Sequence, residues 1–197
     1  MTSNRKVDKS AFIQFCKQLA SVWGSTPFEE LLQEAREELL KPLSLADFKK
    51  YNNLDSGYGI YCFWLEQKEL DDLKNFKAVW NKTKGTYKIT QPTQKWYSKN
   101  QVAKNGLRPF YMGKREDVVK RIQEHAFKSS KSTYGLHLYR NKTEWQDNIF
   151  VSYFILPKEA LSELSIKGNE DKYLQQLVLS FLETRLRQEF SPMVGKQ

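Results

Sequence analysis

Cysteine is scarce in this sequence, with Cys16 and Cys62 the two cysteines among 197 residues. Two cysteines without a metal-ligand spacing predict neither a disulfide framework nor a structural zinc site. No apolar run reaches the roughly twenty residues that a membrane-spanning helix needs, and the polar N-terminus does not have the form of a signal peptide. We therefore expect a cytoplasmic protein with no membrane partner.

Acidic residues are missing from one long stretch. Leu73 to Arg108 contains no Asp or Glu but nine Lys and Arg residues, a positive excess equal to the net charge of +9 of the whole chain. Aromatic residues are interleaved with these charges, and this composition favours contacts with phosphates and bases. The alternative is a lysine-rich surface segment that its aromatic residues anchor to the core. The residues expected to bind nucleic acid in this stretch are Lys82, Lys84, Lys88, Lys95, Trp96 and Lys99.

A second acid-free run lies between Glu124 and Glu144. It adds Lys128, Lys131 and Arg140 to the basic residues expected to bind nucleic acid, and its serine and threonine hydroxyls are further donors to phosphate. The chain as a whole therefore favours an anionic partner, most simply nucleic acid.

The stretch 109–125 predicts a short strand, a glycine turn at Gly113 and then a helix. Glu116 and Asp117 are expected in the first turn of that helix, where the helix dipole favours acidic side chains.

Basic side chains are expected to gather beside this strand end. Arg121 and His125 are four residues apart and share one face of the predicted helix. Lys114 lies just before the helix on the same side, and Tyr111 lies in the strand. Such a cluster can hold a phosphate through charge-assisted hydrogen bonds. The alternative is a solvated basic edge.

The last predicted helix, 171–190, is apolar on most of its circumference, and Glu183 lies among its apolar residues. A buried carboxylate needs a partner, because an unpaired buried charge is costly. One interpretation is a salt bridge to a nearby arginine. The other is a metal ligand, since Mg²⁺ prefers oxygen ligands and commonly takes one or two protein carboxylates.

Gly59-Ile60-Tyr61 and Tyr111-Met112-Gly113 resemble the paired motif of the GIY-YIG nuclease family, and further positions agree in order. The agreeing positions are Lys114 directly after the second motif, Arg121 at the place of the catalytic arginine, His125 as in the restriction-endonuclease-like branch, Glu183 at the place of the metal-binding glutamate, and Pro192 at the place of the proline that ends the helix. The resemblance covers about 57–65 and 109–195.

The resemblance implies a metal-dependent endonuclease that hydrolyses DNA phosphodiester bonds, with a type II restriction-like enzyme as one form. It implies one Mg²⁺ or Mn²⁺ on Glu183 and double-stranded DNA as the partner, and it admits a homodimer. Either Tyr61 or His125 is the general base, and the sequence leaves that choice open. The alternative is a nucleic-acid-binding module that has lost catalysis. The implied catalytic residues are Tyr61, Tyr111, Lys114, Arg121, His125 and Glu183.

Two features differ from the family pattern. A short hairpin usually joins the two motifs, whereas Tyr61 and Tyr111 are fifty residues apart here. Many members have an asparagine three residues after the proline, where this chain has Gly195.

We expect an α/β (α+β) fold in which helices flank a small, mainly antiparallel sheet of about three strands. The expected division is a helical arm at 1–56 and a nuclease-like domain at 57–197, with a basic insertion at 66–108. The helices of the arm are expected to pack against the sheet. The expected strands are 58–65, 109–112 and 148–156, and the expected flanking helices are 115–127 and 171–190.

Overall fold

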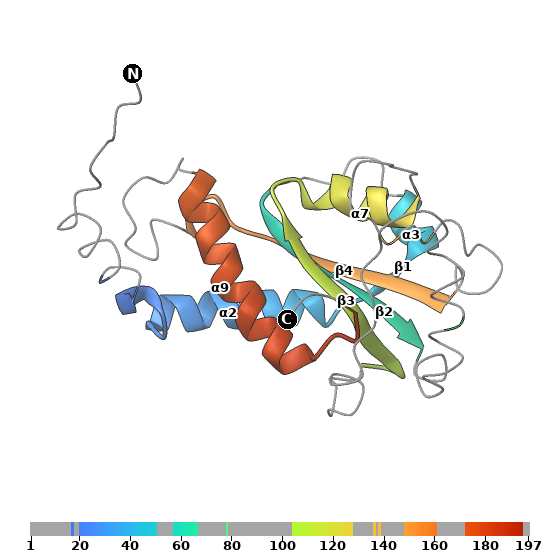
Figure 1. Ribbon diagram of the computed structural model, residues 1–197, viewed down its shortest axis with the longest axis horizontal. Coiled ribbons are helices and arrows are strands. Elements are labelled where there is room, and N and C mark those ends of the chain that lie inside the picture. Colours follow the sequence, from blue (N-terminus) through green and yellow to red (C-terminus); the bar gives the residue numbers. More distant parts are fainter. Residues whose placement is uncertain are drawn as a thin grey trace, which may run out of the picture.

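The computed structural model describes five stretches of the chain (Figure 1). They are residues 20–50, 57–66, 104–127, 148–160 and 172–194, together with the single positions 17, 78, 136 and 138.

The described residues form a mixed fold on an antiparallel sheet of four strands in the order β1-β4-β2-β3. The α+β class is therefore confirmed, but the sheet has one strand more than the three expected. The added strand, β1, pairs two residues with β4 and is too short to show a period in the sequence. The strands are β1 (Leu43–Ser44), β2 (Gly59–Glu66), β3 (Leu107–Arg115) and β4 (Ile149–Ile155).

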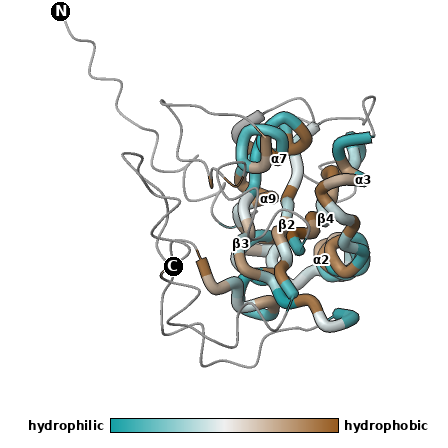
Figure 2. The backbone as a smooth tube through the Cα atoms, turned by 90° about the vertical axis from the view of Figure 1, so that its right-hand side faces the viewer, coloured by the Kyte–Doolittle hydropathy of each residue, from teal (hydrophilic) through white to brown (hydrophobic). Residues whose placement is uncertain are grey.

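Helices cover both faces of the sheet. One face packs against α3 and α7, and we name it the α7 face. The opposite face packs against α2 and α9, and we name it the α9 face (Figures 1 and 2). Among the helices of the described residues, none combines the length and the apolar character needed to cross a membrane. The helices are α2 (Thr26–Leu39), α3 (Leu45–Lys50), α7 (Val118–Ala126) and α9 (Lys172–Phe190).

The strand β2 alternates between two cores because successive side chains of a strand point to opposite faces. Tyr61, Phe63 and Leu65 enter the core of the α7 face. Ile60, Cys62 and Trp64 enter that of the α9 face, where the Trp64 indole donates to the Ser152 hydroxyl at 2.8 Å. The continuous apolar run in the sequence reflects this burial on both faces.

The expected glycine turn at Gly113 is wrong. β3 continues through Gly113 to Arg115, and Gly113 pairs with Tyr61 of β2. Helix α7 begins later, at Val118, with Asp117 as its N-cap accepting a hydrogen bond from the Lys120 amide at 2.9 Å. The acidic residues therefore precede the helix instead of filling its first turn.

Gly113 serves close packing rather than a turn. A Cβ at this position would lie 2.6 Å from the Tyr61 hydroxyl oxygen and 2.9 Å from Tyr61 Cζ. The absent side chain is what allows the tyrosine ring to lie across the neighbouring strand.

A β-bulge lies in β3 opposite Phe63. Because the bulge inserts one residue, both Phe110 and Tyr111 join the α7 face although they are consecutive in the chain. The segment that follows α9 lies along the outer edge of β3, where Val194 forms a parallel bridge with Tyr111 and its amide donates to the Phe110 carbonyl at 2.6 Å. The bulge and the segment after α9 therefore both lie next to Tyr111.

Replacing Gly113 by alanine is expected to lower the free energy of unfolding by about 1–3 kcal/mol, because the new methyl group overlaps a buried ring. Urea denaturation measures the change. Gly57→Ala is the matched control, since its Cβ would meet only Ile155 Cγ2 at 3.3 Å, and the change there should stay within about 1 kcal/mol. Equal effects of the two variants would contradict this account.

Candidate functional site

A buried hydrogen-bonded chain connects three segments of the protein. The Leu136 amide donates to Nδ1 of His125 at 2.8 Å, and Nε2 of His125 lies 2.7 Å from the Tyr61 hydroxyl. A backbone amide can only donate, so Nδ1 accepts, and the proton of the neutral ring lies on Nε2. His125 therefore donates to the Tyr61 oxygen. His125 has no exposed surface and Tyr61 is 2% exposed.

The series of hydrogen bonds continues from the Tyr61 hydroxyl to the Tyr111 hydroxyl. Burial raises the pKa of Tyr61 well above its ordinary value, and Tyr111 raises it further through its charge and a hydrogen bond. Burial also raises the pKa of Tyr111, while the hydrogen bond with Tyr61 lowers it. Because the Tyr61 oxygen already accepts the proton of His125 Nε2, the proton of Tyr61 itself is available for the hydrogen bond with Tyr111. The hydrogen bonds thus run in one direction, from the Leu136 amide to the partly exposed Tyr111.

Arg121 from α7 adds positive charge to this cluster. It forms an ion pair with Glu124 at 2.8 Å, and its side chain is 13% exposed. Partial burial acts to lower the pKa of Arg121, but Glu124 and the two tyrosines raise it above its ordinary value. Arg121 in turn lowers the pKa of both Tyr61 and Tyr111. The guanidinium is a permanent cation beside two phenolic oxygens.

Glu183 reaches the same strand from the other face of the sheet. Its side chain is 18% exposed, and its carboxylate accepts from Arg187 Nη1 at 3.3 Å. The same Nη1 donates to the Met112 carbonyl of β3 at 2.8 Å. Glu183 raises and Arg187 lowers the pKa of Tyr111, so both charges act on this tyrosine. We call Tyr61, Tyr111, His125 and Arg121 the tyrosine cluster. The predicted salt bridge to a nearby arginine is present.

The carboxylate of Glu183 fits a hard cation such as Mg²⁺ or Mn²⁺. It is partly accessible, and Arg187 contacts one of its two oxygens. Mg²⁺ is commonly held by one or two carboxylates and completes its shell with water and phosphate. No cluster of three or more His, Cys, Asp or Glu is present in the part of the chain that the structure describes.

Lys114 lies on the face of the sheet opposite to Arg121 and His125, contrary to the expectation that it shares their side. Its register partner in β2 is Ile60, which enters the core of the α9 face. Residues directly opposite each other in antiparallel strands share a face, so Lys114 belongs to the α9 face and Tyr61 to the α7 face. The expectation failed because it placed a turn at Gly113 and ignored the alternation of a continuing strand.

The residues expected to bind nucleic acid lie outside the described residues. They are Lys82, Lys84, Lys88, Lys95, Trp96, Lys99, Lys128, Lys131 and Arg140. Gly195 lies outside them as well.

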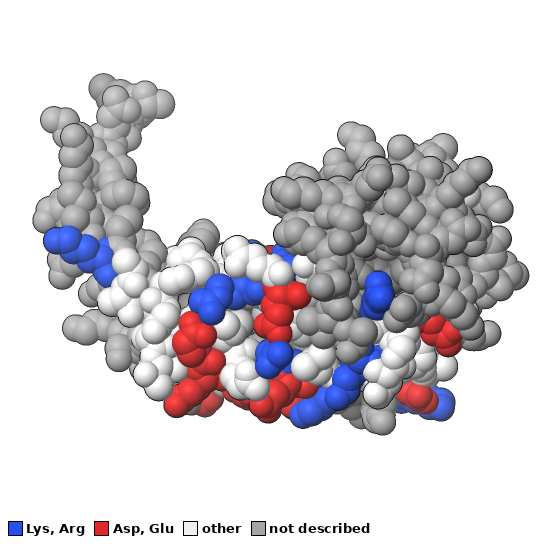
Figure 3. Space-filling model, turned by 90° about the horizontal axis from the view of Figure 1, so that it is seen from below, with Lys and Arg blue, Asp and Glu red and all other residues white. Residues whose placement is uncertain are grey.

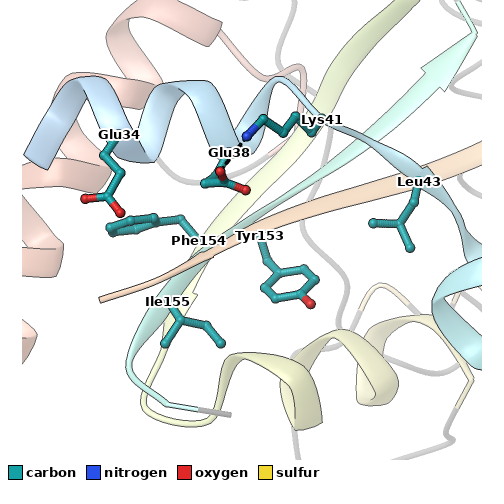
Figure 4. Close-up of a pocket in the computed structure, with 7 residues that line it drawn as sticks. All are labelled: Glu34, Glu38, Lys41, Leu43, Tyr153, Phe154 and Ile155. Atoms are coloured by element: carbon teal, nitrogen blue, oxygen red, sulfur yellow. Dashed lines mark hydrogen bonds and ion pairs between the residues drawn. The ribbon is translucent and has the colours of Figure 1, made fainter. Parts of the chain in front are cut away.

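The surface that can be described near α2 is acidic. This helix carries five glutamates and one arginine, and the view from below shows several acidic side chains, with basic ones among them, on this side of the molecule (Figure 3). An open groove of about 350 Å³ lies where α2, β1 and β4 meet, lined in part by Glu34 and Glu38 (Figure 4). It shares no residue with the tyrosine cluster. We do not expect DNA phosphates on this acidic side.

Sequence reasoning missed Glu124 and Arg187, the ion-pair partners of Arg121 and Glu183. Their spacings, i,i+3 and i,i+4 on helices, were the signal that could have found them. It also missed the Leu136 amide, for which a sequence carries no signal, since any residue except proline has a backbone N–H.

No family model, no curated protein and no solved structure matches this chain. The assignment of a function therefore depends on the motifs and on the geometry of the cluster.

The neutral ring of His125 is expected to carry its proton on Nε2, because Nδ1 accepts the Leu136 amide. A long-range ¹H–¹⁵N correlation spectrum of the folded protein near pH 7 distinguishes the two nitrogens. A proton on Nδ1 would contradict the direction of the hydrogen-bonded chain.

The raised pKa of Tyr61 has a consequence for stability above pH 10. The folded protein keeps the Tyr61 proton after the unfolded chain has lost it, so this stability is present below about pH 10 and is lost as the pH rises. Between pH 10 and 11, wild type should lose up to about 1.4 kcal/mol more than Tyr61→Phe. Urea denaturation at each pH measures this, and equal losses in both proteins would contradict the burial of an un-ionised Tyr61.

Proposed function

We propose that the protein is a divalent-metal-dependent endonuclease that hydrolyses phosphodiester bonds of double-stranded DNA. The observation that carries the proposal is the set of groups that act on Tyr111, namely Tyr61, Arg121, Arg187 and Glu183. Positive charge beside hydroxyl groups and one accessible carboxylate suits a phosphodiester, which needs charge neutralisation and a positioned water. The resemblance of the two triplets to the GIY-YIG motifs supports the same conclusion.

Arg121 is the residue proposed to stabilise charge that develops on the scissile phosphate. Its pKa is raised despite partial burial, mainly through Glu124, so it stays cationic at any pH of interest. The ion pair with Glu124 also restricts the side chain to one arrangement. A preorganised cation costs little reorganisation during the reaction, which is the basis of electrostatic catalysis.

Tyr111 is the better candidate for the group that takes the proton of the attacking water. Tyr61 is buried and its pKa is raised well above the ordinary value. Both ring nitrogens of His125 are engaged in hydrogen bonds. Tyr111 is partly exposed and accepts from Tyr61; burial raises its pKa above the ordinary value, while Tyr61, Arg121 and Arg187 act to lower it. We propose that Tyr61 and His125 position Tyr111 and stabilise its ionised form.

Glu183 is proposed to hold the Mg²⁺ or Mn²⁺. When bound, such an ion neutralises the scissile phosphate and the departing oxygen. The remaining contribution of Glu183 is to place its carboxylate beside β3, within electrostatic reach of Tyr111. A type II restriction-like role and a homodimer belong to this proposal as the forms that the resemblance admits.

A second candidate is a nucleic-acid-binding module without catalysis. It is favoured by one observation, the complete burial of His125 and near-complete burial of Tyr61 in an apolar core. Satisfied buried hydrogen bonds of this kind also occur for purely structural reasons. Salt-dependent retardation of DNA without cleavage would support it.

Arg121→Ala and Glu183→Ala are each expected to lower the rate of DNA cleavage by at least roughly 10²-fold, because each removes a charge that the transition state requires. The assay incubates plasmid DNA with the full chain in Mg²⁺, with a parallel reaction in EDTA. Cleavage that needs both the metal and the two side chains supports the proposal.

Arg36→Ala and Glu189→Ala are the matched controls, since they remove a partly exposed ion pair between α2 and α9. They should retain wild-type cleavage. Full activity of either Arg121→Ala or Glu183→Ala would reject the site. Discrete fragments would indicate a site-specific enzyme, and a smear would indicate a nuclease without a fixed target.

A further inference from the structure

Arg187 is held in place by two acceptors from different elements. It lies one turn after Glu183 on α9, and its Nη1 donates both to Glu183 and to the Met112 carbonyl of β3. The Met112 bond, at 2.8 Å, is shorter than the 3.3 Å contact to the carboxylate. The backbone carbonyl is a fixed acceptor, so it keeps the guanidinium beside Glu183.

The position of Arg187 opposes a second cation at the same carboxylate. Its side chain is 19% exposed and that of Glu183 is 18% exposed, so water screens this pair only in part. A divalent ion on Glu183 would lie within several ångströms of the guanidinium. At an effective dielectric constant of roughly 20, that repulsion corresponds to at least about tenfold in a dissociation constant.

The other charges of the cluster do not offset this repulsion. Arg121 is paired with Glu124, as Glu183 is paired with Arg187. These four side chains sum to zero charge, so each of the two carboxylates already has its charge offset by an arginine.

We propose that Arg187 is a positioning residue that restrains divalent-metal binding at Glu183. It fixes the carboxylate beside β3 and offsets its charge, so the metal binds weakly to the free protein. This inference rests on the proposed function, because it takes Glu183 as the metal ligand. It assigns a role to a side chain that lies outside the motif residues.

The test is a titration of the full chain with Mn²⁺, followed by calorimetry or by the electron paramagnetic resonance signal of free Mn²⁺. Arg187→Gln retains a donor for Met112 but removes the charge, and it should bind Mn²⁺ at least about tenfold more tightly than wild type. Arg187→Lys retains the charge and should stay within about threefold of wild type. Glu183→Gln should lose the site. Thermal unfolding checks that each variant is folded, and Arg187→Met replaces Arg187→Gln if the latter is not.

The outcomes separate this inference from the proposed function. Loss of binding in Glu183→Gln together with unchanged or weaker binding in Arg187→Gln overturns the role of Arg187 but leaves the metal site. No Glu183-dependent binding in any variant overturns both. Tighter binding in Arg187→Lys as well would attribute the effect to the shape of the side chain and would overturn the charge argument.

Discussion

The hydrogen bond between Tyr61 and His125 is the interaction on which the arrangement of the site depends. It joins β2 to α7 in a region without solvent, and Leu136 occupies the second nitrogen of the imidazole. A buried polar group without a partner is costly, so each member holds the other two in place. The position of Tyr61 also requires a glycine at residue 113, because the Tyr61 ring occupies the space that a side chain there would need.

The edge strand β3 brings charges from both faces of the sheet together. Arg121 and Glu124 lie on α7, and Glu183 and Arg187 lie on α9, so each pair is formed within one helix and the pairs lie on opposite faces. β3 is the last strand in the sheet order, and charges from both faces act on its Tyr111. These two ion pairs are neutral in sum, and each of the two arginines already has a carboxylate partner.

The spacing of apolar residues predicted the long helices and strands well, because that spacing follows directly from which faces of an element are buried. β2, β4 and α9 lie within two residues of their expected ends. β1, the bulge in β3 and the continuation of β3 past Gly113 were not predicted. Each of these features depends on contacts with a strand that is distant in the sequence. A glycine such as Gly113 is compatible with a turn and also with a strand whose backbone lies close to a neighbouring side chain.

The sequence indicated which residues of β2, β3, α7 and α9 to consider together, but it did not predict how they are arranged. Spacing placed Arg121 and His125 together, yet the direction of proton donation depends on the Leu136 amide, which no motif contains. Once Nδ1 accepts, Nε2 must donate, and Tyr61 must direct its own proton outward to Tyr111. The hydrogen-bonded chain therefore ends at the partly exposed Tyr111, with Tyr61 and His125 buried behind it. This arrangement is why we propose Tyr111 as the base in place of either buried residue.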